Sequence, residues 1–142
     1  MRNSNRLSYA VHILSYIYII NERHNEEKIS SEKMAASLNV TPITVRQIMG
    51  NLKAAGFIET VRGSAKVKIL KKPEDITFLD IFQAVSEENI FYRYYDTNIN
   101  CPIGKNVPLI MDEFYNNVEE ATQKEMEKYT LNKVIENLKR NM

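Results

Sequence analysis

The fold of this chain is decided by residues 30–70, which read SSEKMAASLNVTPITVRQIMGNLKAAGFIETVRGSAKVKIL. The pattern predicts a short helix over 30–38, a break at Asn39, and a second helix that ends at Gly56. Two short apolar runs follow on either side of residues 62–64 and predict a β-hairpin. A helix, a tight turn, a helix and a hairpin in this order are typical of a winged helix-turn-helix, whose second helix lies in the major groove of DNA.

Both helices have local signals at their starts. Ser30 can cap the first helix, and Glu32 lies in its first turn, where the helix dipole favours negative charge. The second helix opens at Thr41, a good N-cap, followed by Pro42, whose missing N–H costs nothing at the first helical position. Its inward face is apolar at helical spacing and consists of Val45, Ile48, Met49 and Leu52.

The opposite face of the second helix is polar and consists of Thr44, Arg46, Gln47, Asn51 and Lys53. These side chains can hydrogen-bond base edges or phosphates, although a merely solvated helix face has the same composition. The hairpin favours DNA binding, because Lys66 and Lys68 alternate with apolar residues and a strand turns both to one side. Arg62 lies at its turn, so a cationic hairpin adjoins a polar recognition helix.

Net charge is divided between the two halves of the sequence. Residues 1–72 hold 12 Lys and Arg against 5 Asp and Glu, a net charge of +7, and residues 73–142 hold 7 against 13, a net charge of −6. This asymmetry indicates an anion-binding domain joined to an element that does not touch the anion. Arg2 and Arg6, at the start of a helix predicted over 3–21, can also reach phosphates, although flexible N-terminal arginines are more often merely solvated.

Several segments resemble the Rrf2-type bacterial transcription regulators, a group linked to iron–sulfur, cysteine and nitric-oxide responses. They are residues 7–11 (LSYAV), 29–32 (ISSE), 45–57 and 61–63 (VRG), with a loop containing Cys101 and Pro102 before a long helix. The resemblance covers nearly the whole chain and implies a dimeric repressor or activator. It also implies that the residues nearest DNA are Thr41, Ile43, Thr44, Arg46, Gln47 and Arg62. We add to this predicted set Arg2, Ser31, Asn51, Lys66 and Lys68.

Two features depart from the pattern of that family. The wing carries Ser64, Ala65 and Lys66 where the family commonly has a glycine pair. The iron–sulfur members use three closely spaced cysteines, whereas this chain has one, so we predict no cofactor and no metal. His12 and His24 are too widely separated to indicate a metal pair.

The C-terminal half opens with a short apolar helix, capped by Thr77 and Asp80 and closed at Glu87. Residues 89–106 then have no clean periodicity. They contain four aromatic residues, Phe91, Tyr92, Tyr94 and Tyr95. We favour loop anchors over a cofactor pocket for these rings, and the resemblance leaves an effector role open.

Cys101 is the only thiol of the chain and lies just before a predicted helix N-terminus, near Lys105. A helix N-terminus and a cation both stabilise the thiolate, so Cys101 is a candidate redox sensor. The alternative is that Cys101 is a small buried hydrophobe.

A heptad-like apolar seam begins at Val107 and continues with Met111, Phe114, Val118 and Ala121. It predicts a helix of roughly 20 residues with Pro108 in its first turn, paired antiparallel with a second copy. Packing on its own domain is the alternative. A last amphipathic helix over 130–138 is expected to fold back.

The sequence therefore predicts a mainly α fold with a small β-hairpin wing. We expect a winged helix-turn-helix domain over 1–86, a connecting or effector loop over 87–106 and a helical dimerisation element over 107–142. No catalytic constellation or glycine-rich phosphate loop is present in the sequence, so we predict no enzyme.

The predicted function is a homodimeric, sequence-specific regulator, expected to repress at a pseudo-palindromic operator in response to a redox or small-molecule signal. The alternative is a winged-helix interaction module that has lost DNA binding. One cysteine suits a reducing cytoplasm, and the most apolar run, residues 10–20, is too short to span a bilayer. We expect no signal peptide and no membrane partner.

Overall fold

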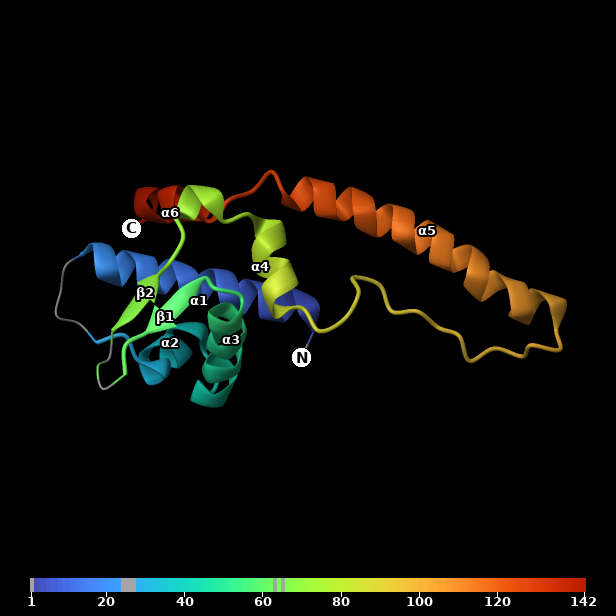
Figure 1. Cartoon of the computed structure of the whole chain (residues 1–142), viewed down its shortest axis with the longest axis horizontal. Coiled ribbons are helices and arrows are strands. Elements are labelled where there is room, and N and C mark those ends of the chain that lie inside the picture. Colours follow the sequence, from blue (N-terminus) through green and yellow to red (C-terminus); the bar gives the residue numbers. More distant parts are fainter. Residues whose placement is uncertain (1, 24–27, 63, 65) are drawn as a thin grey trace.

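The computed structural model describes residues 2–23, 28–62, 64 and 66–142 (Figure 1). His24 and the wing positions Gly63 and Ala65 lie outside these residues. Helix α1, Asn3–Glu22, is central, because helices α2, α3, α4 and α6 and strand β2 all contact it. Its fully buried side chains are Ala10, Ile13, Leu14 and Ile17.

The helix-turn-helix consists of α2, Ser31–Leu38, and α3, Pro42–Ala54. Both predicted N-caps are confirmed. The Ser30 hydroxyl accepts a hydrogen bond from the Lys33 N–H at 3.2 Å, and the Thr41 hydroxyl accepts one from the Thr44 N–H at 3.4 Å. Asn39 ends α2 in the left-handed conformation (φ 55°), which Asn adopts more readily than most residues.

The wing is an antiparallel hairpin of β1, Ile58–Thr60, and β2, Val67–Ile69. Ile58 and Val67 are buried against the helices, while Lys68 is exposed opposite Glu59. The side-chain amide of Asn21 donates to the Val67 carbonyl at 2.8 Å, which ties the hairpin to α1.

After a short 3-10 helix η1, Pro73–Asp75, helix α4 spans Phe78–Val85 and has the predicted capping box at its start. The last helix, α6, spans Leu131–Arg140 and folds back as predicted. Its Leu131 and Ile135 side chains are buried in the core.

Helix α5, Pro102–Met126, extends away from the body of the molecule (Figure 1). It begins five residues before the predicted start, so the placement of Pro108 in its first turn was wrong: Pro108 is an interior residue. A proline there leaves the carbonyl four residues earlier, that of Gly104, without its helical donor. The Thr97 hydroxyl donates to this carbonyl and replaces the missing bond.

Gly104 also permits the close approach of the preceding loop to α5. A Cβ at this position would lie 2.6 Å from the Asn98 carbonyl oxygen, which is closer than side chains tolerate. In the described part of the chain, no helix is both long and apolar enough to cross a bilayer.

Candidate nucleic-acid interface and effector loop

The N-terminal end of α3 lies at the lower edge of the molecule in Figure 1, and strand β1 of the hairpin contacts α3. Thr41, Arg46 and Gln47 are exposed on α3, and Thr44 and Asn51 are half-buried. Ile43, a large apolar side chain near the start of this helix, is 64% exposed. This end of α3 therefore presents polar groups and one apolar group to solvent.

Arg46 is paired with Glu32, which belongs to α2. Its Nη2 lies 2.8 Å from the Glu32 carboxylate, and both side chains are more than half exposed. An exposed pair of this kind contributes about 0–1 kcal/mol, so Arg46 can exchange Glu32 for a phosphate or a base edge at little cost. The pair meanwhile holds the guanidinium above the junction of the two helices.

The wing presents its cations to solvent. Arg62, Lys66 and Lys68 are all exposed. Lys53, near the end of α3, donates to the Thr60 hydroxyl of β1 at 2.8 Å and so connects the recognition helix to the hairpin.

The two N-terminal arginines have different environments. Arg2 is exposed, whereas Arg6 is only 4% exposed and donates to the carbonyl of Val85 at the end of α4. Arg6 also pairs with Glu87 at 3.4 Å. The expectation that Arg6 reaches phosphates was therefore wrong, because its side chain holds α1 to α4. Ser31, the first residue of α2, is half-buried.

The loop before α5 is held to that helix by Arg93. Its guanidinium donates to Glu119 at 2.7 Å and to Asn116 at 3.2 Å, and it stacks 4.7 Å from the centre of the Tyr115 ring. Arg93 and Glu119 are 11% and 12% exposed, so this ion pair is largely removed from solvent. The Glu119 carboxylate also accepts the Phe91 N–H at 3.2 Å.

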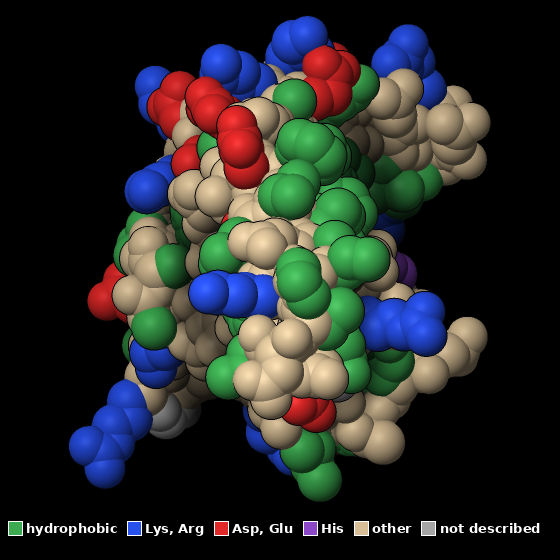
Figure 2. Space-filling model, turned by 90° about the vertical axis from the view of Figure 1, so that its right-hand side faces the viewer, with side chains coloured by type: hydrophobic (Ala, Val, Ile, Leu, Met, Phe, Trp, Pro, Cys, Tyr) green, Lys and Arg blue, Asp and Glu red, His purple; other side chains and the backbone are tan. Residues whose placement is uncertain are grey.

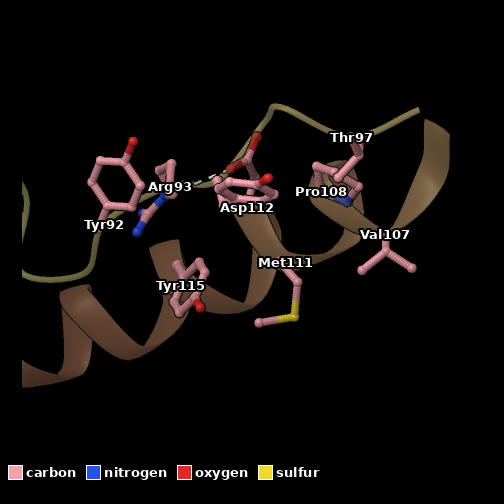
Figure 3. A pocket seen from close by; sticks show the side chains of 9 residues that line it. Tyr92, Arg93, Thr97, Val107, Pro108, Met111, Asp112 and Tyr115 are labelled. Atoms are coloured by element: carbon pink, nitrogen blue, oxygen red, sulfur yellow. Dashed lines mark ion pairs between the residues drawn. The ribbon is translucent and has the colours of Figure 1, made fainter. Parts of the chain in front are cut away.

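A small pocket of about 170 Å³ lies between this loop and α5 (Figure 3). Asp112 lies at its polar side, where it accepts a 2.6 Å hydrogen bond from the Tyr95 hydroxyl and faces Arg93 at 3.6 Å. The bond to Asp112 raises the pKa of Tyr95. The remaining lining is mainly apolar or aromatic and includes Tyr92, Val107, Pro108, Met111 and Tyr115.

Sequence reasoning missed the cluster around Arg93. The signal available was the spacing of Asp112, Asn116 and Glu119, which places three polar side chains on one face of the helix. Two of the four loop aromatics do contact α5: Phe91 stacks on Tyr115, and Tyr95 reaches Asp112.

Cys101 is the N-cap residue of α5 and is half-buried. Its side chain forms no capping hydrogen bond, but the backbone N–H groups of Gly104 and Ile103 in the first turn of α5 favour the thiolate and lower the pKa of the thiol. The thiolate is the reactive form, so this position favours reactivity.

Large apolar side chains along one face of α5 are uncovered. Those at helical spacing are Ile103, Val107, Ile110, Phe114 and Val118, which we call the α5 stripe. Val107, Phe114 and Val118 were predicted, whereas Ile103 and Ile110 were missed. Met111 is half-buried and lines the loop pocket, so it lies at the edge of this face. Figure 2, in which the right-hand side of Figure 1 faces the viewer, shows hydrophobic side chains gathered down the middle of that side of the molecule.

The arrangement of α2, α3 and the cationic hairpin defines a winged helix-turn-helix protein, which confirms the predicted fold class. Residues 3–137 match the model of the Rrf2 family, described as iron-dependent transcriptional regulators. The chain belongs to the Rrf2 family, as its sequence motifs predicted.

Known relatives support this assignment over the full length. YwnA of Bacillus subtilis (strain 168), provisionally named an HTH-type transcriptional regulator, is 33% identical over 136 residues, which are 95% of this chain and 98% of YwnA. A crystal structure described provisionally as a DNA-binding protein has a TM-score of 0.72 and 32% identity, covering 92% of this chain and 98% of that one. The oxidized form of Staphylococcus aureus CymR has the same fold (TM-score 0.64, 20% identity, 96% and 97% covered).

The chain is thus a DNA-binding transcriptional regulator, and the prediction that it is not an enzyme is confirmed. The description of the family names iron, but the donors of this chain do not fit an iron–sulfur cluster of its own. Such clusters are held mainly by cysteines, and the sequence contains only Cys101. Nor does the described part of the chain gather three His, Cys, Asp or Glu side chains that could hold a metal ion.

Proposed function

We propose that this regulator is a cytoplasmic homodimer that represses transcription by binding a pseudo-palindromic operator. The observation that carries the proposal is the combination of an exposed recognition face with an uncovered α5 stripe. The first supplies contacts to one half-site, and the second supplies a surface through which two copies can pair.

The α5 stripe supports pairing because solvated apolar side chains at helical spacing are costly to leave uncovered. Phe114, at the midpoint of α5, is about half exposed, as are Val107, Ile110 and Val118. Self-complementary surfaces of this kind form two-fold symmetric dimers. Such a dimer presents two copies of α3, so the half-sites are expected about one helical turn of DNA apart or a multiple of it.

Contacts to DNA divide into two kinds. Arg46 and Gln47 can read base edges through hydrogen bonds, and Ile43 can pack on a thymine methyl group. Arg62, Lys66 and Lys68 on the wing are suited to phosphates, as is Arg2 at the N-terminus. Thr41, Thr44, Asn51 and Ser31 complete the proposed contact set around the helix-turn-helix.

The signal is proposed to arrive at the loop before α5. The pocket beside Arg93 is small enough for a compact molecule of only a few heavy atoms, and Cys101 begins the helix that carries the stripe. A change at either place alters the contact between the loop and α5, and therefore the angle at which the two α5 helices of the dimer pair. Since the chain has one thiol, disulfide formation would need a second copy or a small-molecule thiol.

The dimer is tested with Phe114→Asp, which places a charge in the stripe at a cost of several kcal/mol. Leu109→Asp is the matched control, since Leu109 is equally apolar and exposed but lies outside the stripe. Size-exclusion chromatography with light scattering should report a monomer for the first variant and a dimer for the second. A Phe114→Asp protein that stays dimeric at micromolar concentration would contradict this assignment of the interface.

DNA binding is tested by gel-shift titration against the promoter of the operon that encodes the protein. The expected result is a complex at nanomolar concentration that survives competition by random DNA. Binding no stronger than that of a neutral protein of equal size would support the interaction module. Repression is tested with a reporter under the same promoter, where deletion of the regulator should raise expression.

A further inference from the structure

The pocket between the loop and α5 has a free hydrogen-bond acceptor at its polar side. The Tyr95 hydroxyl at 2.6 Å and the Arg93 Nε at 3.6 Å both contact the Oδ1 oxygen of Asp112. The second oxygen, Oδ2, has no partner among the residues that the structure describes. Asp112 lines the pocket and its side chain is 31% exposed, so this carboxylate is accessible to a small molecule there.

Arg93, the other charged side chain of the pocket wall, already has partners. Its Nη1 donates to Glu119 at 2.7 Å and to the Phe91 carbonyl at 2.9 Å, and its Nη2 donates to Asn116 at 3.2 Å. An anion would have to displace Glu119 to bind this guanidinium. Arg93 supplies one positive charge, whereas Asp112 and Glu119 supply two negative charges, so the pocket wall has a net charge of −1.

Two tyrosine rings at the pocket are open to solvent. Tyr92 and Tyr94 line it and are 79% and 62% exposed. Neither has a hydrogen bond or a ring contact to another residue in the described part of the chain. The face of such a ring attracts a cation. Tyr115 differs, because its ring already contacts Phe91 and the Arg93 guanidinium.

The rest of the lining sets the size of a ligand and its apolar part. Val107, Pro108 and Met111 lie beside Asp112 on α5 and line the pocket (Figure 3). The volume of about 170 Å³ is close to that of a cavity that holds benzene, so it suits a molecule of about six non-hydrogen atoms.

We propose that this pocket binds a primary alkylammonium ion of about six non-hydrogen atoms. The ammonium group donates a hydrogen bond to Asp112 Oδ2 and lies against the rings of Tyr92 and Tyr94. The alkyl chain packs on Val107 and Met111. This inference rests on the proposed function, in which the loop pocket receives the signal, and it names the chemical class of that signal.

Calorimetric titration of the full chain with three molecules of similar shape tests the charge of the ligand. They are 3-methylbutylammonium, the neutral 3-methylbutanol and the anionic 3-methylbutanoate. The amine is a cation at neutral pH, because alkylamines titrate near pH 10. Phosphate buffer is used, since Tris is itself a primary amine.

We expect the ammonium ion to bind with a dissociation constant on the order of 0.1–1 mM, a range suited to so small a ligand. The alcohol and the carboxylate should bind at least about tenfold more weakly, because neither supplies a cation to the free carboxylate oxygen and the open rings. Tyrosine fluorescence gives a second readout, since the chain has no tryptophan and eight tyrosines. Equal or tighter binding of the alcohol or the carboxylate would overturn the inference.

Asp112→Asn tests the acceptor, because it keeps the shape of the side chain and lets its amide oxygen accept from Tyr95. The dissociation constant of the ammonium ion should rise on the order of 10- to 100-fold with the loss of a charged hydrogen bond. Glu113→Gln is the matched control, since Glu113 is the exposed next residue and lies outside the pocket lining. An equal loss in the two variants, or none in Asp112→Asn, would contradict binding at this carboxylate.

Tyr92→Leu tests the ring at an exposed position, where the fold should be kept. It should weaken the ammonium ion roughly two- to fivefold and leave the alcohol unchanged, because only the cation is attracted by the ring. A parallel loss for both molecules would mean that the ring acts only as an apolar surface, and this would overturn the proposed contact with a cation.

The measurements separate this inference from the proposed function. Dimerisation and operator binding are measured by light scattering and gel shift without the amine. A dimer that binds its operator but shows no binding of 3-methylbutylammonium at about 10 mM would overturn the inference and leave the dimeric regulator standing. Binding of the ammonium ion without any change in operator affinity would support the ligand site and contradict its role in the response to a signal.

Discussion

Replacing Glu119 by alanine should release the loop before α5 without unfolding the protein. The Glu119 carboxylate accepts the Arg93 guanidinium at 2.7 Å and the Phe91 N–H at 3.2 Å. Glu119→Ala removes both bonds and leaves a guanidinium that is 11% exposed. Its remaining partners are the Phe91 carbonyl at 2.9 Å, Asn116 at 3.2 Å and the more distant Asp112 at 3.6 Å.

The magnitude lies between two limits. An exposed ion pair contributes about 0–1 kcal/mol, and breaking a fully buried pair costs about 3–5 kcal/mol. Because Arg93 keeps part of its bonding, Glu119→Ala is expected to lower the free energy that holds the loop on α5 by about 2–3 kcal/mol. Since the loop is anchored mainly to α5, this free energy should be lost from local opening of the loop and not from global unfolding.

Hydrogen exchange measured by mass spectrometry tests this prediction. The peptide containing Phe91 should exchange roughly 30- to 150-fold faster in Glu119→Ala than in the wild type. This ratio corresponds to about 2–3 kcal/mol, since about 1.36 kcal/mol is a factor of ten. Glu120→Ala is the matched control, because Glu120 forms only an exposed pair with Lys124 at 3.5 Å. Equal exchange at Phe91 in the two variants would refute the argument that Arg93 and Glu119 fasten the loop.

Three further outcomes are expected. Thr41→Ala should cost about 1 kcal/mol of stability through the lost N-cap of α3, measured by urea denaturation; an unchanged midpoint would contradict this role. Arg62→Ala should weaken binding to all DNA and reduce the slope of log K against log salt concentration by about one. Gln47→Ala should instead cost about 1–3 kcal/mol of binding free energy on specific DNA only. The lowered pKa of Cys101 means that its thiolate persists to lower pH than that of a free cysteine. Its alkylation by iodoacetamide should therefore continue below the pH at which a peptide cysteine stops, and reaction only after denaturation would exclude a redox role.

The helix ends in the winged domain could be predicted because each depends on residues a few positions apart. Ser30, Thr41 and the Thr77–Asp80 box all form the expected caps. The hairpin and its exposed lysines followed from alternation, which is also a local signal.

The start of α5 could not be predicted in the same way. An interior proline costs about 3 kcal/mol, so Pro108 favoured a helix beginning beside it. The structure tolerates Pro108 because the Thr97 hydroxyl bonds the carbonyl of Gly104, a contact that depends on the path of the loop. A start at Pro102 adds Ile103 to the exposed face.

The candidate site was predicted only in part. The exposed positions of α3 and the wing follow from helix and strand periodicity, whereas the burial of Arg6 depends on the position of α4. The bond between Arg93 and Glu119 joins residues 26 positions apart, and only the folded loop brings them together.

The most direct test of the account is selection of bound DNA from a random pool by the full chain. Two copies of α3 related by two-fold symmetry should enrich a pseudo-palindrome, with half-sites about one helical turn apart or a multiple of it. The Phe114→Asp protein should enrich at most one half-site. Enrichment of a single unrepeated site by the wild-type chain, or of no sequence at all, would contradict the dimeric DNA-binding mode.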